Sequence, residues 1–284
     1  MYQRSISRRN PACIVVLLDR SDSMKEPWRQ SGTSLADGAT RAVNRLLLDL
    51  CMRSTKEVGG DVRDYFNVMV LGYGACPVAG GEGVEPALGG ALAGRGIVSV
   101  RDLAMAPLAV RDEPSADRFS GPSRSPVWIE SVHGYRTPMC QAIAEAGRYV
   151  FEWTGEHPDS FPPAIINITD GFVTDSPFDG ADLAEWTKRL TTIETDDGPA
   201  LLFNVFLSRT GEPRFFPTSG AQLPDPGPQL FEMSSSLPDV MVANARAAGK
   251  TVEPGARAMC FNADIDALTA FLEIGTRVAE VRDR

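Results

Sequence analysis

The sequence has few of the side chains that hold zinc or activate a nucleophile. It contains only two histidines and five widely spaced cysteines, and no Cys-x-x-Cys pair occurs, so a zinc site is not expected. No Gly-x-Ser-x-Gly motif is present, which leaves the active site of an α/β-hydrolase without support. Several cysteines lie inside apolar runs, where a free thiol behaves as a small buried hydrophobic residue.

The sequence also lacks a long apolar segment. Residues 1–10 are polar and include three arginines, and the apolar core of a signal peptide does not follow them. The first apolar run, Ile14–Leu18, is too short to span a membrane and ends in charged residues. We therefore expect a cytoplasmic protein that does not bind a membrane, with residues 1–11 forming a flexible N-terminal arm.

The sequence has fewer basic than acidic residues, 28 against 37. The net charge is −9 and the isoelectric point is about 4.9, which disfavours nucleic acid as a partner and suits cations or basic surfaces. The 284 residues, 43% of them hydrophobic, are enough for one large domain with a sizeable core. No repeat and no long linker divides the chain, so a single domain over residues 12–284 is predicted.

Strand-like and helix-like segments alternate along most of the chain. Apolar runs bounded by turn residues predict strands, and apolar residues spaced three and four apart predict helices. The predicted strands cover Ala12–Asp19, Tyr65–Gly74, Gly96–Val100, Ala164–Asp170, Leu201–Leu207 and Ala256–Phe261, and the predicted helices cover Ser34–Arg53, Pro138–Trp153, Asp179–Thr192, Pro238–Ala248 and Ile265–Val281. This alternation predicts an α/β fold with a doubly wound, mostly parallel central sheet flanked by helices. Residues 75–125, rich in glycine and proline, are expected to be an insertion.

Polar side chains follow the first predicted strand directly. The apolar run that ends at Leu18 is succeeded by Asp19, and then by hydroxyls at alternate positions, Ser21 and Ser23. Ligands of open α/β sheets bind at the carboxyl ends of the strands, which is where these residues are expected. One carboxylate with two hydroxyl oxygens is a hard-oxygen set that suits Mg²⁺ or a similar divalent cation.

Two later stretches can complete the same site. Thr137 lies in a loop that opens a predicted helix, within Gly134–Met139. Asp170 follows the apolar strand that begins at Ala164, within the sequence Thr-Asp-Gly. Taken singly, each motif is more often a helix cap or a turn than a metal ligand. Their occurrence together, each at a strand end or a helix start, predicts a formed site.

The three motifs, in this order, resemble a von Willebrand factor A (VWA) domain with its metal-ion-dependent adhesion site. The resemblance covers roughly Pro11 to Arg277 and implies a Rossmann-like fold. It implies that the metal is Mg²⁺, with Mn²⁺ or Ca²⁺ as alternatives. It also implies a ligand set in which acids act through water and hydroxyls bind directly: Asp19, Ser21, Ser23, Thr137 and Asp170. The sequence departs from the common motif at Asp22, where glycine is usual, and this puts the affinity for an acidic partner in doubt.

The resemblance further implies a function without catalysis. A cation with an open position binds a Glu or Asp carboxylate of a partner protein. Cytoplasmic bacterial proteins with a single VWA domain accompany Ser/Thr kinases, protein phosphatases or AAA+ ATPases. The stretches 62–66, 137–140 and 161–171 carry that narrower likeness. The expected function is therefore an adaptor in a bacterial signalling, stress or defence system.

Two other functions remain open on the sequence. The protein could be a metal-independent scaffold that uses the 75–125 insertion or the Pro213–Pro228 loop. It could also be a metal-dependent hydrolase, since two acids and a cation can activate water. The hydroxyl-rich set favours binding over hydrolysis, so an enzyme is not expected.

Overall fold

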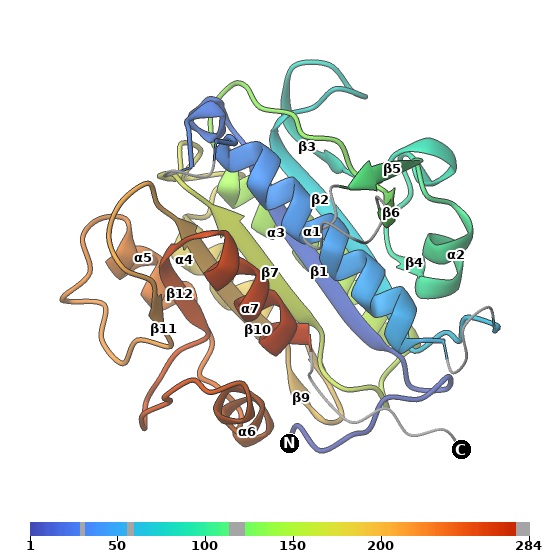
Figure 1. Ribbon diagram of the computed structural model, residues 1–284. Coiled ribbons are helices and arrows are strands. Elements are labelled where there is room, and N and C mark those ends of the chain that lie inside the picture. The colour runs from blue at the N-terminus through green and yellow to red at the C-terminus, as the bar shows by residue number, and fades with distance from the viewer. Residues whose placement is uncertain (29–31, 56–59, 114–122, 277–284) are drawn as a thin grey trace.

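The computed structural model describes residues 1–28, 32–55, 60–113 and 123–276. A twisted sheet of eight strands runs through the centre of the molecule (Figure 1). Seven strands follow the order β11 (Arg214–Phe215), β12 (Met259–Ala263), β10 (Leu201–Leu207), β7 (Ala164–Thr169), β1 (Ala12–Arg20), β2 (Phe66–Ala75) and β3 (Glu82–Pro86). The eighth, β4 (Val98–Ser99), also pairs with β2.

The sheet is mixed. Its five inner strands, β12, β10, β7, β1 and β2, are parallel, whereas β3 and β4 run antiparallel to β2, and β11 runs antiparallel to β12. The prediction of a doubly wound, mostly parallel, Rossmann-like sheet is therefore wrong. The fold is a mixed α/β architecture. The physical reason lies partly in the β2–β3 connection. Cys76 and Gly80–Gly81 close a tight turn, and so short a connection can only join antiparallel strands.

Helices cover both faces of this sheet, which explains why β1 is buried along its whole length. One face packs against α1 (Leu35–Arg53), α2 (Val100–Met105), α6 (Asp239–Ala247) and α7 (Ile265–Thr276). The other packs against α3 (Met139–Glu156), α4 (Leu183–Thr191) and α5 (Gly227–Met233). Alternate residues of β1 enter the two cores, with Val16 on the first face and Val15 on the second.

The glycine-rich and proline-rich segment adds structure at one margin of the sheet. It contains β3, a short 3-10 helix (Gly90–Leu92), β4, α2 and β5 (Ala109–Glu113). β5 pairs with β6 (Ser123–Val127) in a separate two-stranded sheet. The strand predicted over Gly96–Val100 is reduced to two residues, because the Ser99 side chain accepts the Asp102 amide and starts α2.

The N-terminal residues contact a second small hairpin, β8 (Glu194–Thr195) and β9 (Gly198–Pro199). The carboxylate of Asp197, in the turn of this hairpin, accepts the backbone amides of Gln3 and Arg4 at 2.8–3.0 Å. Whether residues 1–11 are flexible stays a prediction. Within the described residues, no helix is both long enough and apolar enough to cross a bilayer.

Candidate functional site

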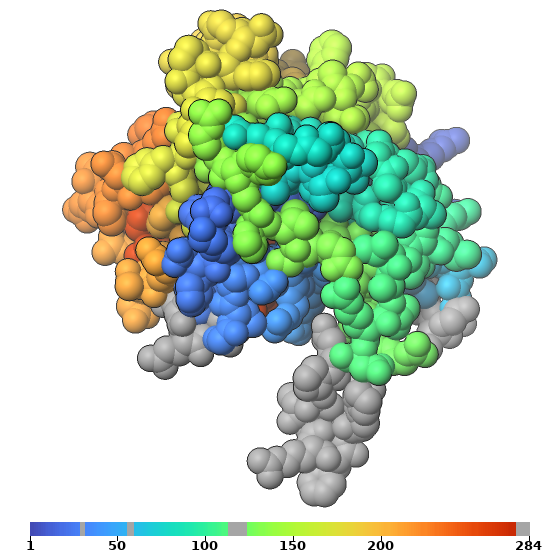
Figure 2. All heavy atoms as spheres, turned by 90° about the horizontal axis from the view of Figure 1, so that it is seen from above, coloured from blue at the N-terminus to red at the C-terminus, as the bar shows by residue number. Residues whose placement is uncertain are grey.

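Four chain segments meet where β1 and β7 end. They are the end of β1 with the 3-10 helix Asp22–Lys25, the 76–81 turn, the loop 134–138 and the loop after β7. Figure 2 looks down on this face and shows the blue, cyan, green and yellow segments side by side. Backbone hydrogen bonds join three of them, the end of β1, the loop 134–138 and the loop after β7, since the Gly134 amide donates to Arg20, the Asp22 amide to Tyr135 and the Thr174 amide to Thr137.

Asp19 is the buried acid of this edge, with an exposed fraction of only 1%. Its Oδ1 accepts the Ser21 amide at 2.8 Å, and its Oδ2 accepts the Thr169 hydroxyl at 2.6 Å. Burial, and to a smaller extent the nearby charge of Asp170, raise the pKa of the Asp19 carboxyl to about 7, against the lowering effect of the hydrogen bonds. The carboxylate therefore lies where its negative charge is poorly compensated.

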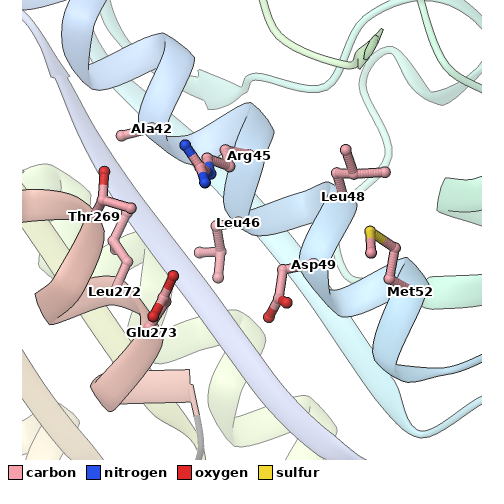
Figure 3. A pocket seen from close by; sticks show the side chains of 9 residues that line it. All are labelled: Ala42, Arg45, Leu46, Leu48, Asp49, Met52, Thr269, Leu272 and Glu273. Atoms are coloured by element: carbon pink, nitrogen blue, oxygen red, sulfur yellow. The ribbon is translucent and has the colours of Figure 1, made fainter. Parts of the chain in front are cut away.

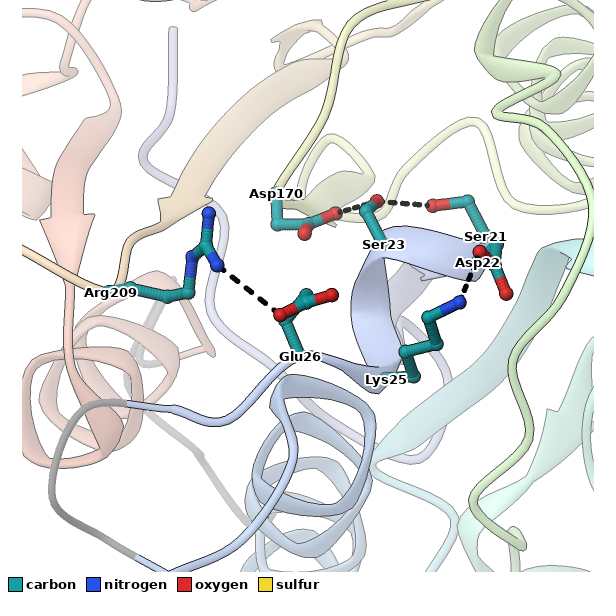
Figure 4. A network of polar contacts seen from close by, with 7 residues as sticks. All are labelled: Ser21, Asp22, Ser23, Lys25, Glu26, Asp170 and Arg209. Atoms are coloured by element: carbon teal, nitrogen blue, oxygen red, sulfur yellow. Dashed lines mark hydrogen bonds and ion pairs between the residues drawn. The ribbon is translucent and has the colours of Figure 1, made fainter.

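A chain of oxygens leads from Ser21 to Asp170 (Figure 4). The Ser21 and Ser23 hydroxyls lie 3.1 Å apart, and the Ser23 hydroxyl donates to Asp170 Oδ1 at 2.8 Å. Burial also raises the pKa of Asp170, although the Ser23 hydrogen bond opposes this. The sequence-predicted residues Asp19, Ser21, Ser23 and Asp170 are thus brought together.

Thr137 completes the group from the loop before α3. Its backbone amide donates to the Thr174 hydroxyl at 2.9 Å, which ties its loop to the loop after β7. A Cβ at Gly171 would lie 3.5 Å from Thr137 Oγ1 and 3.7 Å from Ser23 Oγ. The two hydroxyls therefore flank the position where Gly171 has no side chain, and all five predicted residues share one edge of the sheet.

Charged side chains surround this group. Asp22, which departs from the family motif, pairs with Lys25 at 2.6 Å, and both are exposed. Arg209, from the loop after β10, pairs with Glu26 at 3.3 Å, and its positive charge lowers the pKa of Asp170 (Figure 4). Asp22 is therefore engaged in an exposed ion pair of its own.

The structure gives roles at this site to two residues outside the predicted ligand set. Thr169 holds Asp19, and the only sequence signal for it was a hydroxyl next to Asp170 in the Thr-Asp-Gly motif. Asp175 accepts the amides of Cys140 and Gln141 at 2.9 and 2.8 Å, and so caps the start of α3 just after Thr137. Its sequence position alone did not reveal this role.

The donor set fits a small hard cation on one structural test. Two carboxyls with raised pKa values share an edge of the sheet with three hydroxyls. The oxygens of Ser21, Ser23 and Asp170 hydrogen-bond to one another, and the same lone pairs could bind a cation instead. The set contains no softer ligand. Over the described ranges of the chain, no three His, Cys, Asp or Glu side chains form a metal-ligand group.

A groove elsewhere offers different chemistry. It lies between α1 and α7 and has a volume of about 280 Å³ (Figure 3). Leu46 and Leu272 form its floor, and Arg45, Asp49 and Glu273 stand around it. None of the five predicted site residues lines this groove.

Comparison with known proteins returned no family model and no curated protein that match the chain. Two solved structures are similar to it. The pilus adhesin SpaC of Lactobacillus rhamnosus GG matches with a TM-score of 0.48 and 12% identity, over 97% of this chain and 31% of that chain. The PilB minor pilin of Streptococcus sanguinis matches with a TM-score of 0.46 and 11% identity, over 95% of this chain and 61% of that one. The chain thus spans about a third and three fifths of their lengths.

These findings correct the predicted family. No family model matches, and the neighbours are described as a pilus adhesin and a minor pilin, not as VWA domains. The assignment to the VWA family, and with it the family's adhesion site, is therefore wrong. With TM-scores below 0.5, the two likenesses give this chain no function either. What remains is the geometry of the residues themselves.

Proposed function

We propose that this protein is a non-enzymatic interaction module that binds an acidic side chain of a partner through a divalent cation. Mg²⁺ suits the oxygen set best, and Mn²⁺ is its closest substitute. The residues that would hold it are Asp19, Ser21, Ser23, Thr137 and Asp170. The bound cation would supply an electrophilic centre that attracts a carboxylate.

One observation carries this proposal, the unbalanced charge of the oxygen chain. Asp19 and Asp170 both have raised pKa values because they are buried, and the charge of Asp170 contributes to the shift at Asp19. No cationic side chain forms an ion pair with Asp19 in the described structure. Two carboxylates so arranged repel each other when ionised. A divalent cation would remove that repulsion and leave the site with positive charge for a partner.

Binding fits the site better than hydrolysis. The side-chain hydrogen bonds of Ser21 and Ser23 go to each other and to Asp170, and none goes to a histidine that would activate a hydroxyl. Each Asp19 oxygen accepts one hydrogen bond, from the Ser21 amide or the Thr169 hydroxyl, so the carboxylate is held in place and keeps lone pairs for a cation.

Exposed aromatic rings next to the site support a protein partner. Tyr135 and Phe172 are 56% and 57% exposed, and each is two residues from a predicted ligand. Tyr135 adopts a φ of 65°, a strained conformation for a bulky residue, with its carbonyl bound to the Asp22 amide. Folding gains nothing from exposing these rings, whereas a partner could cover both beside its acidic side chain.

The first test is the effect of Mg²⁺ and Mn²⁺ on thermal stability. A ligand that binds only the folded protein raises its stability in proportion to the logarithm of the ligand concentration. The proposal expects a rise in the wild type that is lost in Asp170→Asn. The matched control is Asp22→Asn, an exposed carboxylate on the same loop, which should keep the rise. A wild type indifferent to both metals would contradict the proposal and favour a metal-independent scaffold.

The second test concerns the partner. We propose an adaptor in the bacterial cytoplasm, with a Ser/Thr kinase, a protein phosphatase or an AAA+ ATPase as the partner classes to examine. Tagged wild type and Asp170→Asn would be compared in pulldowns from native lysate, with Mg²⁺ or with EDTA. A partner retained only by the wild type, and only with Mg²⁺, is expected. Partners that are equally retained in EDTA would contradict a metal-mediated contact.

A further inference from the structure

Arg20 is a buried charge at the end of β1, within the candidate site. It stands between Asp19 and Ser21, yet its exposed fraction is only 3%. Its side chain lies over β2 at Gly72, where a Cβ would come within 2.5–2.6 Å of the Arg20 Nε, Cδ and Cζ atoms. The guanidinium therefore occupies the space that Gly72 leaves open.

The partner of Arg20 is Glu85 on the outer strand β3. Glu85 stands opposite Gly72 in the β2–β3 register, and its Oε1 is 3.7 Å from Arg20 Nη1. The same carboxylate accepts the amides of Val78 and Ala79 at 3.3 and 2.9 Å. Glu85 thus joins the end of β1 to the 76–81 turn.

The backbone at Arg20 is tied in the opposite direction as well. The Arg20 carbonyl accepts the Gly134 amide at 2.9 Å, and the Asp22 amide donates to the Tyr135 carbonyl at 2.9 Å. These bonds reach the loop that carries Thr137. Gly74 packs against the same peptide so closely that a Cβ would lie 2.7 Å from the Ser21 nitrogen. Arg20 is therefore the point where β1, the β2–β3 hairpin and the Thr137 loop converge.

Stability alone does not explain this pair. A buried ion pair contributes little net stability because both charges lose their hydration, and apolar residues of similar size often do as well. The Arg20–Glu85 contact is long, and the buried Arg20 Nε has no hydrogen-bond partner among the described residues. One of the segments that the pair joins, however, is the end of β1, which leads directly into Ser21 and Ser23, and the backbone of Arg20 also binds the loop that carries Thr137.

We propose that Arg20 and Glu85 form a buried latch that positions the Ser21–Ser23 and Thr137 loops for the cation. The inference rests on the proposed function, and neither residue binds the metal. Removing residues that orient metal ligands typically weakens metal binding about 10- to 100-fold. Loss of the latch should therefore weaken cation binding while the sheet remains folded.

Two variants open the latch in different ways. Gly72→Ala adds a methyl group where the guanidinium lies, without changing any charge. Its matched control is Gly83→Ala on β3, where the added Cβ would meet only Cys76 Sγ, at an ordinary 3.7 Å. The double variant Arg20→Met with Glu85→Gln removes both charges together, so that neither is left buried and unpaired.

Two measurements separate the latch from the metal. The first is hydrogen exchange of the Asp22 and Gly134 amides without metal, with Val16 in the centre of β1 as the reference. We expect exchange at Asp22 and Gly134 to quicken about 10-fold in Gly72→Ala and in the double variant, with Val16 unchanged. The second is Mn²⁺ affinity by electron paramagnetic resonance, which should fall about 10- to 100-fold in the same two proteins and stay at the wild-type value in Gly83→Ala.

Each outcome bears on one claim. Wild-type exchange at Asp22 and Gly134 in both latch variants would overturn the latch, whatever the metal does. Faster exchange with unchanged Mn²⁺ affinity would overturn its role in positioning ligands. A wild type that binds no Mn²⁺ would overturn the proposed function, while the exchange data would still decide whether the latch holds the loops.

Discussion

Two buried polar networks lie on neighbouring strands of the same sheet and differ in charge. The first is neutral: the Tyr73 hydroxyl donates to Asn167, Asn167 donates to Asn204, and Asn204 donates to Ser234, at 2.8–3.0 Å. The second contains the carboxyls of Asp19 and Asp170. Every amide in the neutral network has a partner, whereas the acidic network holds two carboxyls with raised pKa values.

This difference separates structure from function. A fully paired neutral network fixes the positions of strands and leaves no charge for a ligand to neutralise. Burial of an acidic network disfavours the ionised form of its carboxyls. A cation that enters the network would stabilise that ionised form. The two networks are therefore expected to respond differently to mutation, pH and metal.

The largest expected effect comes from breaking the neutral network. Asn204→Ala removes one hydrogen-bond partner each from the Asn167 amide and the Ser234 hydroxyl, both deeply buried, and leaves a small cavity. The free energy of unfolding should fall by about 3–5 kcal/mol. Urea denaturation with and without Mg²⁺ checks this, and the increment due to Mg²⁺ should stay at its wild-type size. A lost increment would mean that the two networks act as one.

The next effect is a pH dependence that only the acidic network should show. Folding raises the pKa of Asp19 from 3.8 to about 7, so between these values the folded state binds more protons than the unfolded state. Without metal, this group's contribution to stability is full below pH 4 and is lost as the pH rises towards 7, on the order of a few kcal/mol. Asp19→Asn should flatten that fall in pH-dependent urea denaturation. An equal slope in both proteins would show that Asp19 titrates normally.

Removing one hydroxyl should affect metal binding more than folding. Ser23→Ala deletes the donor to Asp170 and the neighbour of the Ser21 hydroxyl, at a cost of about 1 kcal/mol in stability. Mn²⁺ affinity should fall about 10-fold, because a ligand and an orienting hydrogen bond are lost together. Calorimetric titration of the variant against the wild type measures this. Unchanged affinity would exclude Ser23 from the ligand set.

The smallest effect is expected at the rim. The positive charge of Arg209 acts on Asp170 and opposes a cation. Because Arg209 is exposed, Arg209→Gln should tighten Mn²⁺ binding only about twofold at low salt and less at high salt. Titrations at two ionic strengths test this. Weaker binding in the variant would show that Arg209 orders the site.

The sequence predicts the apolar elements well because their patterns are local. The strand expected over Ala12–Asp19 extends to Arg20, and the helix expected over Ser34–Arg53 begins at Leu35, where the Ser34 side chain caps it. The helix expected from Asp179 starts at Leu183, because Asp182 accepts the Glu185 amide and Asp179 has a φ of 46°. Residues 277–281 of the last predicted helix lie outside the described residues.

What the sequence misses depends on pairing between distant segments. Strand β3, with the sequence Glu-Gly-Val-Glu-Pro, has no apolar run, so only its pairing with β2 reveals it and makes the sheet mixed. The three motifs do converge as predicted, because parallel strand ends meet at one edge. The contact between Arg20 and Glu85 depends on the β2–β3 register, and no local sequence pattern predicts it. The predicted family rested on the motifs alone, and the comparisons overturned it.

The most direct test of the central claim is calorimetric titration of the wild type with Mg²⁺, at pH 7 and at pH 8.5, in two buffers of different ionisation enthalpy. Since the pKa of Asp19 is about 7, binding at pH 7 should release about half a proton from this carboxyl, and almost none at pH 8.5. One Mg²⁺ per chain with this release is the expected result. Absence of binding, or binding with the same proton release at both pH values, would contradict a cation site built on the buried acid.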